Sequence, residues 1–358
     1  IMVVCMVGAY VAIYYRRQKF NVFWYSHHLL IVMLIALCCH GIGNLLEPFQ
    51  SVYWVIGPLT LYMIPRILRE TKCSNTKVLD ASVMDGEIIS LKLEKPKGLW
   101  SRVQAGQYAF LNIPKLSRAE WHPFTLTSAP HEEHLEFAIQ AVGDWTRSTR
   151  DLLGDASLDA CVGGSSFPNI KVEGPIGASS QDFSKFPILV LIGAGIGVTP
   201  MISVVKELLK NPGQMKRTIL YWTIRDQAAV EWFTSVLDDI YQQDDKNVIQ
   251  IRHFLTSVKY DDRDLGAVLL HYAARSKHKH TNIDIILGRQ THHQVEVGRP
   301  VWDKELQSVR EEAKELGNNR AGIFLCGPSR MAEEVDDVSF KLSRDDPNFH
   351  FYFNKETF

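Results

Sequence analysis

The sequence predicts three domains in order: transmembrane α-helices at residues 1–70, an antiparallel β-barrel at residues 71–182, and a doubly wound α/β domain at residues 183–358. Three observations predict this order. Residues 20–42 contain no Asp, Glu, Lys or Arg, and from Thr76 onward apolar and polar side chains alternate with a period of two. Residues 188–200 then pass from an apolar run through a glycine-rich turn into a helical pattern. Each pattern is typical of a different domain class.

The first domain is predicted to cross a membrane. A charge-free run of this length matches the roughly 20 residues that span a bilayer. It lies between two further apolar runs, at residues 1–15 and 52–68. Basic residues after the first and third runs mark one cytoplasmic side, namely Arg16, Arg17, Lys19, Arg66 and Arg69. We expect two full spans and the end of a third, in a piece of a longer protein that opens within an apolar run. Buried core helices of a soluble protein are the alternative.

The second span contains His27, His28 and His40. Ionisable side chains in a membrane helix are costly and favour a functional interpretation, and neutral imidazole is a common axial ligand of haem iron. A helix rises about 20 Å from His27 to His40, which would put one ligand near each membrane face. The two imidazoles point roughly 140° apart on an ideal helix, however, so spacing alone does not pair them. Haem ligation and a structural alternative, with His27 and His28 at the interface and His40 satisfied within the protein, both stay open.

Short strands at even spacing predict the barrel. Strands are expected at residues 78–83, 88–93, 108–113, 123–128 and 134–141. Asp85-Gly86 indicates a tight hairpin. The barrel ends with VEGPIGASS, in which Gly174 and Gly177 flank Pro175. Such glycines let backbone N–H groups approach a phosphate, although Gly-Pro turns are common in purely structural loops.

WHPFTLTSAP, at residues 121–130, is the stretch around which the chain is organised. Pro123 fixes φ beside the aromatic Phe124, and Thr125 and Thr127 share one face of a half-buried strand. The pattern suits a wall that holds a ligand. Most such strands are only barrel wall, so the segments on either side decide between the two interpretations.

The glycine-rich turn in the last half is the clearest motif. The run ILVLI is followed by Gly193, Gly195 and Gly197, and Thr199-Pro200 open a helix expected at residues 201–209. A buried strand, a glycine turn, a Thr cap and a Pro at the first helical position make a helix N-terminus that favours a pyrophosphate. The spacing is GxGxG rather than GxGxxG, and GxxxxGK[ST] is absent from the sequence. A purely structural strand-turn-helix is the alternative.

Further strands are expected at residues 218–222, 248–255, 283–287 and 322–325. Their alternation with helices predicts a doubly wound sheet whose ligand lies at the carboxyl ends of the strands. Arg225-Asp226 follows one strand and Cys326-Gly327-Pro328 another. Arg225 would pair with a 2′-phosphate and favour NADPH over NADH, or else form a surface ion pair.

Charge and cysteine usage exclude some classes. The net charge of -1 argues against an electrostatically driven nucleic-acid partner. The chain has 6 cysteines, and the sequence contains no CxxC pair, so neither a disulfide framework nor a zinc site is predicted.

With these pieces in place, the chain resembles the NADPH oxidase family, the superoxide-generating flavocytochromes b, over nearly its whole length. The motifs that carry the resemblance are FWYSHHL with the later His40, WHPFTLTSAP, VGDWT, VEGPIG, LIGAGIGVTP, YWTIRD, GRPVW, FLCGP and the terminal FNKETF. Most are weak singly, but their combination in this order is specific. A broader resemblance is to ferredoxin NADP reductases and ferric reductases.

The resemblance implies FAD, NADPH and two b-type haems. His27 would ligate the haem nearer the cytoplasm and His40 the outer one. The residues implied at the FAD are His122, Pro123, Phe124, Thr125, Thr127, Gln140, Trp145, Thr146, Gly174, Gly177 and Phe358. The residues implied at the NADPH are Gly193, Gly195, Gly197, Thr199, Pro200, Arg225, Asp226, Arg299, Cys326, Gly327 and Pro328.

Three of these residues are implied in catalysis. Thr125 would lie near the reactive N5 atom of the flavin and Cys326 on the nicotinamide side. Phe358 would cover the flavin ring and give way to the nicotinamide before hydride transfer.

The chain departs from the family pattern in two places. Relatives have IRxVGDWT, with the arginine facing the flavin diphosphate, whereas this chain has Gln140 in IQAVGDWT. The change removes a bidentate cation, for which Arg147 or Arg150 would have to compensate. The partner histidines of the family lie on an earlier membrane helix that is not in this sequence, so the chain carries half of each haem site.

The resemblance implies an integral membrane enzyme with cytoplasmic reductase domains. NADPH would reduce FAD, two haems would carry the electrons across the membrane, and oxygen would become superoxide or hydrogen peroxide. Implied partners are oxygen, the lipid membrane, the N-terminal helices missing here, and membrane or cytosolic regulatory subunits; no nucleic acid is expected. Alternatives are a transmembrane ferric-chelate reductase, a structural or channel subunit with a degenerate reductase domain, and a soluble reductase fused to a non-haem anchor.

Overall fold

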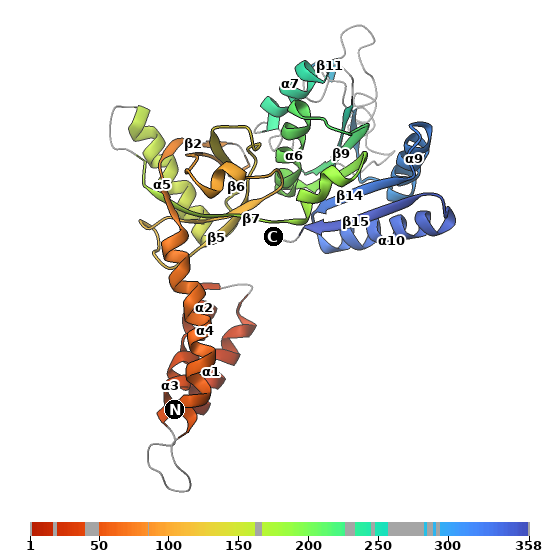
Figure 1. Cartoon of the computed structure of the whole chain (residues 1–358). Helices are drawn as coiled ribbons and strands as arrows, with labels where there is room; N and C mark the ends of the chain where they lie inside the picture. The colour runs from red at the N-terminus through yellow and green to blue at the C-terminus, as the bar shows by residue number, and fades with distance from the viewer. Residues whose placement is uncertain are drawn as a thin grey trace, which may run out of the picture. The chain divides into compact units, whose positions relative to one another are not determined.

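The structure is a computed structural model. It describes residues 2–16, 20–39, 50–84, 86–161, 167–225, 233–244, 248–256, 283–284, 289–290 and 294–356. The chain divides into two compact units, Ile1–Lys72 and Cys73–Phe358. The first unit is helical, and the second combines antiparallel sheets with a layered α/β part (Figure 1).

The described part of the first unit consists of α1 (Met2–Tyr14), α2 (Phe20–His27), α3 (Leu29–Cys39) and α4 (Ser51–Lys72). α1 packs against α2 and α3, and its buried side chains are small: Cys5, Ala9 and Ala12. Small side chains at such a contact let helix backbones approach closely. The span predicted at residues 20–42 is two helices in its described part, because the helical pattern is interrupted at His28.

One described segment, Val22–Cys39, is long and apolar enough to cross a membrane, and it comprises most of α2 and all of α3. α1 is apolar but shorter. Large apolar side chains are exposed on the unit, for example Trp54 at 79% and Val4 at 74%. The helices of this unit therefore present an apolar outer surface of the kind that marks interaction with a membrane or another protein.

The second unit begins with two antiparallel sheets. The first has the strand order β1-β7-β4-β5, formed by Ser74–Thr76, Ile170–Ile176, Tyr108–Asn112 and His122–Thr125. The second has the order β2-β3-β6, formed by Val78–Met84, Ile88–Glu94 and His134–Gln140. A bridge from Leu126 to Phe137 joins the two sheets, and both side chains lie in the core that the sheets share. α5 (Asp144–Cys161) packs against β2.

The rest of the unit is a parallel sheet with helices on both faces. Its strand order is β13-β10-β9-β8-β14-β15, formed by Gln294–Val297, Ile249–Leu255, Arg217–Ile224, Ile188–Ala194, Arg320–Cys326 and His350–Glu356. Every neighbouring pair in this sheet is parallel. α6 (Thr199–Lys210) and α7 (Thr234–Gln243) cover one face, and α9 (Trp302–Glu315) and α10 (Ser329–Asp345) cover the other (Figure 1).

The apolar run of β8 shows why this architecture follows from the sequence. Leu189 and Leu191 pack into the core under α6 and α7, and Ile188, Val190 and Ile192 pack into the core under α9 and α10. A strand that buries both of its faces needs apolar residues at every position, which is what the run ILVLI supplies.

One strand differs from the sequence expectation, and the predicted tight hairpin is present. The strand predicted at residues 283–287 is described only as β11 (Ile283–Asp284), which pairs antiparallel with β12 (Arg289–Gln290) outside the parallel sheet. The predicted hairpin near Gly86 is present, because Met84 pairs with Ile88, while Asp85 lies outside the described residues.

Candidate functional site

The residues predicted to bind the dinucleotide lie at one edge of the parallel sheet. Gly193 is near the end of β8, Cys326 ends β14, and Arg225 directly follows β9. Arg299 lies two residues beyond β13. Because all the strands are parallel, their carboxyl ends share this edge, and the strand order puts Cys326, the glycine turn, Arg225 and Arg299 in that sequence along it. Arg225 and Arg299 are both exposed.

The glycine turn packs tightly on one side and is open on the other. A Cβ on Gly197 would lie 2.6 Å from the carbonyl oxygen of Cys326, so the turn after β8 and the end of β14 meet without room for a side chain. Gly195 has a φ of +55°, and a Cβ there would meet no atom within 4 Å among the described residues. Trp222 steadies the turn by donating a hydrogen bond from Nε1 to the carbonyl oxygen of Gly195, at 2.9 Å. The open side is the one on which a ligand has space.

The predicted Thr cap of α6 is wrong. Thr199 has helical φ and ψ values (-52° and -43°), because a 3-10 helix, Gly195–Val198, leads directly into α6. The residue before α6 makes no capping hydrogen bond with its side chain. Pro200 is at the start of the helix, as predicted, and both residues are buried. The backbone N–H of Thr199 donates to the carbonyl oxygen of Ile196, so the helix N-terminus that faces a ligand is that of the 3-10 helix rather than that of α6.

Cys326 is a buried thiol at this edge. Burial, assisted by the negative charge of Glu356, raises the pKa of the Cys326 thiol to about 12. The thiol is thus protonated at neutral pH, and it is suited to packing and weak hydrogen bonding rather than to nucleophilic attack. Gly327 and Pro328 follow it, with Pro328 exposed at the start of α10.

Glu356 is a site residue that sequence reasoning missed. It pairs with Cys326 in the register between β14 and β15, and it is only 6% exposed. Its Oε1 accepts hydrogen bonds from the backbone N–H and from the hydroxyl of Ser180, both at 2.6 Å. The motif FNKETF contains Glu356, but nothing local in the sequence marks its carboxylate as buried.

The flavin motif forms an aromatic wall. The ring of His122 lies 4.3 Å from that of Trp145, and the ring of Phe124 stacks on Trp145 at 5.8 Å between centroids. Burial lowers the pKa of His122 against the opposing effect of Glu120, so its imidazole is neutral at pH 7. Pro123, between the two wall residues on β5, is exposed.

Thr125 and Thr127 lie deeper in the same segment. Thr125 is 7% exposed and pairs with Tyr108 on β4, and Thr127 is 3% exposed. The backbone N–H of Thr127 donates to the carbonyl oxygen of Glu136 at 2.8 Å. Gly174 lies in β7, whose neighbour is β4, and Gly177 directly follows β7 and is exposed.

The VGDWT motif forms the start of α5. The hydroxyl of Thr146 exchanges hydrogen bonds with the backbone of Gly143, at 2.9 Å and 3.0 Å, and so it caps the helix. Gln140 is exposed at the end of β6. Of the two proposed compensating cations, Arg150 is held by Glu87 and Asp151, while Arg147 is exposed in the first turn of α5.

Some predicted site residues lie outside the described part of the chain: His40, Asp226 and Phe358. His27 is described, at the end of α2, where its imidazole is exposed and lies 5.2 Å from the ring of Phe23. The structure therefore bears on one of the two predicted haem ligands.

Comparison with known proteins assigns both parts of the second unit. Residues 73–180 match a family described as "FAD-binding domain", and residues 186–339 match one described as "Ferric reductase NAD binding domain". The chain is 34% identical to respiratory burst oxidase homolog protein E of Arabidopsis thaliana over 96% of its length. It is 31% identical to respiratory burst oxidase homolog protein B of Solanum tuberosum over its whole length.

The chain is thus similar to respiratory burst oxidases, which are NADPH oxidases, over nearly its whole length. It spans 41% and 46% of these two relatives, less than half the length of either. The matches to the family therefore cover the helical unit and both nucleotide-binding parts of this chain, but not the remaining segments of those proteins.

Solved structures show that this chain has the ferredoxin reductase fold. A ferredoxin NADP+ reductase from Neisseria gonorrhoeae, with bound FAD and NADP, aligns with a TM-score of 0.52 at 13% identity, over 79% of this chain and 98% of the other. A ferredoxin-NADP+ reductase from Plasmodium falciparum, with 2'P-AMP, aligns with a TM-score of 0.51 at 14% identity, over 79% and 96%. At this identity the likeness concerns the fold alone.

The residues of this chain fit the two nucleotides. Among the described residues, none accepts a hydrogen bond from the buried Nε1 of Trp145, which leaves a donor beside the aromatic wall for a flavin. The open side of Gly195, next to the first turn of α6, fits a pyrophosphate. The exposed imidazole of His27 is suited to be one of the two axial ligands of a haem.

Proposed function

We propose that this protein transfers electrons from NADPH, by way of FAD and two b-type haems, across a membrane to oxygen, and that superoxide or hydrogen peroxide is the product. Relatives over the whole chain are respiratory burst oxidase homologues, which supports this assignment. Bound FAD would accept a hydride and pass on single electrons, which is the chemistry that the relay needs.

The observation that carries the proposal is a direct contact between the two nucleotide-binding elements. The hydroxyl of Ser203 donates a hydrogen bond to the carbonyl oxygen of Ser128 at 2.8 Å, and both residues are buried. Ser128 comes three residues after Thr125 of the flavin motif, and Ser203 comes four residues after Thr199 of the dinucleotide turn. A hydride donor and its acceptor must lie about 3–3.5 Å apart, so their binding elements have to be in contact.

The chain's own residues have separate tasks in this proposal. His122, Phe124 and Trp145 bind one side of the flavin, with Thr125 near its N5 atom. The glycine turn with Thr199 and Pro200 binds the pyrophosphate, and Arg225 and Arg299 hold the adenosine phosphate. Cys326, Gly327 and Pro328 flank the nicotinamide, and Phe358 covers the flavin until the nicotinamide replaces it. Pro123, Thr127, Gln140, Thr146, Gly174, Gly177 and Asp226 complete the two sites.

The membrane part of the proposal rests on the first unit. Val22–Cys39 is long and apolar enough to span a bilayer, and it contains His27 near one end. His27 and His40 would each supply one axial ligand, with the second ligand of each haem coming from a helix that precedes this sequence. The nucleotide-binding unit would then lie on the cytoplasmic side, marked by the basic residues after the first and third apolar runs.

A second candidate is a transmembrane ferric-chelate reductase. The match of residues 186–339 to a ferric reductase NAD binding domain favours it. It uses the same relay with a chelated metal in place of oxygen, so the residues described above would have the same roles.

One experiment separates the candidates. NADPH is added anaerobically to the full-length protein in membranes, flavin bleaching and haem reduction are followed by absorbance, and oxygen is then admitted with an assay for superoxide and hydrogen peroxide. Prompt haem reoxidation with release of either product supports the oxidase. A haem that stays reduced until a ferric chelate is added supports the ferric reductase, and flavin bleaching without a haem response contradicts the histidine assignments.

A further inference from the structure

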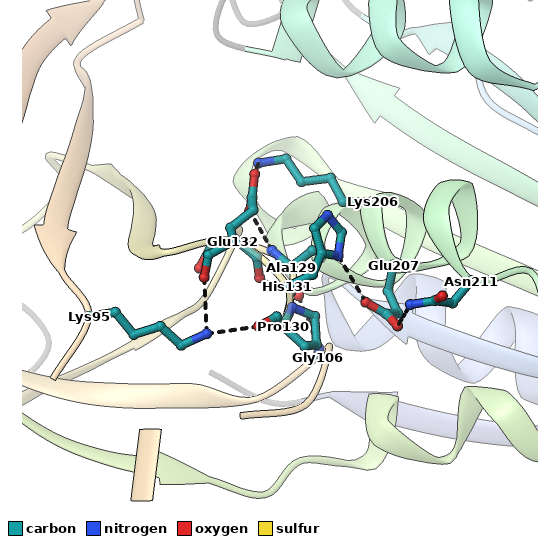
Figure 2. A network of polar contacts seen from close by, with 11 residues as sticks. Lys95, Gly106, Ala129, Pro130, His131, Glu132, Lys206, Glu207 and Asn211 are labelled. Carbon is teal, nitrogen blue, oxygen red and sulfur yellow. Dashed lines mark hydrogen bonds and ion pairs between the residues drawn. The ribbon is translucent and has the colours of Figure 1, made fainter. Parts of the chain in front are cut away.

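Helix α6 carries a polar stripe that faces the flavin domain. Ser203, Lys206 and Glu207 are three and four residues apart, so they lie on one side of the helix. Each contacts the stretch that runs from the end of the flavin motif into β6: Ser203 binds the Ser128 carbonyl, Lys206 binds carboxylates, and the Oε2 of Glu207 lies 3.3 Å from Nδ1 of His131. Figure 2 shows Lys206 and Glu207 reaching toward this segment from α6.

Lys206 makes the strongest of these contacts. Its Nζ lies 2.7 Å from Oε2 of Glu136 and 3.4 Å from Oε1 of Glu132, and the three side chains are only 14–23% exposed. Burial acts to lower the pKa of Lys206, but the two carboxylates outweigh it, so the pKa of Lys206 is above its usual value. Burial acts to raise the pKa of Glu136, but Lys206, with smaller contributions from Lys92 and His134, outweighs that effect, so the pKa of Glu136 is below its usual value. The pair is therefore fully charged at neutral pH.

The segment that Lys206 contacts is also held from the barrel side. Nζ of Lys95 donates to the carbonyl oxygens of Pro130 and Glu132 at 2.8 Å and 3.0 Å, and Oε2 of Glu132 accepts from the N–H of Ala129 at 2.6 Å (Figure 2). This segment directly continues the flavin motif. A shift of α6 relative to it is therefore a shift of the dinucleotide turn relative to the flavin wall.

The distance between Thr199 and Lys206 along α6 means that contacts at Lys206 control the orientation of the helix. Lys206 is seven residues beyond Thr199, which corresponds to about 10 Å of helix. A hydrogen bond at Ser203 fixes one point of the helix, and a second contact about one turn further along fixes its direction. Without the second contact, α6 can pivot about Ser203, and the glycine turn at its N-terminus moves with it.

A metal ion is the competing explanation for this cluster. Ligand atoms of Glu132, His134 and Glu136 lie within 4.8 Å of one another. The carboxylates of Glu132 and Glu136 already contact the ammonium group of Lys206, however, so the side chain of Lys206 neutralises the cluster. The described residues thus give an ion-paired clamp between two domains rather than a metal site.

We propose that Lys206 is a positioning residue for hydride transfer: its ion pairs with Glu136 and Glu132 fix the direction of α6 and thereby the distance between nicotinamide and flavin. This inference rests on the proposed function. It assigns to the pair an effect on the rate of hydride transfer that is separate from nucleotide affinity.

The test measures NADPH-dependent flavin reduction in the full-length protein under anaerobic stopped-flow conditions. Lys206→Met keeps the length of the side chain and removes its charge, and Lys206→Arg keeps the charge. Lys210→Met is the matched control, because Lys210 lies one turn further along α6 and is exposed. For each variant we would measure the first-order rate of flavin bleaching at saturating NADPH, the apparent Kd for NADPH, the long-wavelength charge-transfer band, and the kinetic isotope effect with 4-deuterated NADPH.

Lys206→Met is expected to lower the bleaching rate about tenfold to a hundredfold, because misplacement by about 1 Å has an effect of this size. We expect its Kd for NADPH to stay within about twofold of the wild type, since the mutated side chain does not touch the nucleotide. The charge-transfer band should weaken and the isotope effect should rise. Lys206→Arg should restore most of the rate, and Lys210→Met should behave as wild type.

Several outcomes would overturn the inference. An unchanged rate in Lys206→Met would do so, as would a loss of rate that follows only the loss of bound FAD. If Lys206→Met does not retain FAD, Glu136→Gln becomes the test variant, because it removes the shorter of the two ion pairs and keeps the charge of Lys206, and an unchanged rate there overturns the proposal equally. Failure of NADPH to bleach the flavin in the wild type would instead contradict the proposed function, so the two failures are distinguishable.

Discussion

Ser180 donates two hydrogen bonds to a single carboxylate oxygen of Glu356, one from its backbone N–H and one from its hydroxyl, both at 2.6 Å. The two residues are 176 positions apart in the sequence. Ser180 lies in the segment that links the flavin domain to the parallel sheet, and Glu356 lies on the edge strand β15 opposite Cys326. The pair therefore fastens the C-terminal strand to the junction between the two domains.

Removal of this carboxylate should loosen the junction. Glu356→Ala leaves two buried donors of Ser180 unsatisfied, which costs about 1–3 kcal/mol each. We expect a fall of several degrees in the apparent Tm of the full-length protein, about 2–4 °C for each kcal/mol lost. Glu315→Ala, an exposed acidic residue on α9, is the control. Equal Tm values for the two variants would show that the pair has no stabilising role.

Gly197→Ala should abolish reduction by NADPH while FAD stays bound. The new Cβ would lie 2.6 Å from the carbonyl oxygen of Cys326, and backbone must move to relieve the contact. The turn and the end of β14 would then separate at the dinucleotide site. Flavin fluorescence measures FAD content, and anaerobic bleaching measures reduction. Gly154→Ala is the control, because an added Cβ there makes only an ordinary contact, 3.6 Å from Cγ2 of Val83. Normal reduction in Gly197→Ala would contradict the assignment.

Gln140→Arg should tighten FAD binding. The exposed end of β6 would gain the cation that the family resemblance implies there, while Arg150 is already held by Glu87 and Asp151. A partly exposed charge pair with a phosphate is worth roughly 1 kcal/mol, so the Kd for FAD should fall about threefold to tenfold. Equilibrium titration of the deflavinated protein measures this. Gln307→Arg adds the same charge on α9 and should have no effect.

Arg225→Ala should reduce the preference for NADPH over NADH. A hydrogen-bonded pair of an arginine with a phosphate is worth about 1.5–3 kcal/mol, so the KM for NADPH should rise at least tenfold, and the KM for NADH should change little. Initial rates of ferricyanide reduction give both values. Arg320→Ala is the control, since Arg320 begins β14 at the opposite edge of the sheet. An equal rise in KM for both coenzymes would place Arg225 away from the 2′-phosphate.

His253 should make the α/β domain sensitive to acid. Burial lowers the pKa of His253 to about 4, whereas an unfolded histidine titrates near pH 6.5. The folded state therefore disfavours the proton. Stability contributed by the neutral imidazole is fully present above about pH 6.5 and is lost as the pH falls toward 4, by about 3 kcal/mol in total.

The measurement for His253 is the pH dependence of denaturant unfolding. His253→Phe keeps an aromatic ring next to Trp222, whose ring lies 5.5 Å from that of His253. We expect the variant to lose less stability than the wild type between pH 6.5 and pH 4. His350→Phe, at an exposed histidine, should keep the slope of the wild type. Parallel pH profiles for wild type and His253→Phe would refute a buried neutral imidazole.

Local patterns in the sequence determined the main elements of this protein. The uninterrupted apolar run of β8 can be satisfied only by a strand buried on both faces, and the glycines after it permit a turn that no other residue type fits. Alternating apolar residues likewise set which side of β6 faces the core. These features depend on the periodicity of neighbouring residues, so the sequence alone suffices to predict them.

Only the tertiary structure decided which distant groups meet. The Thr199 cap was predicted wrongly because Gly195–Val198 already coils into α6, and that geometry follows from the packing of Gly197 on Cys326. The pairs Ser203–Ser128, Lys206–Glu136 and Glu356–Ser180 are separated by 75, 70 and 176 residues. Side chains so far apart carry no shared local pattern. Their charges and hydroxyls gain a role only when folding brings them into a buried, weakly screened environment, where a polar group must find a partner.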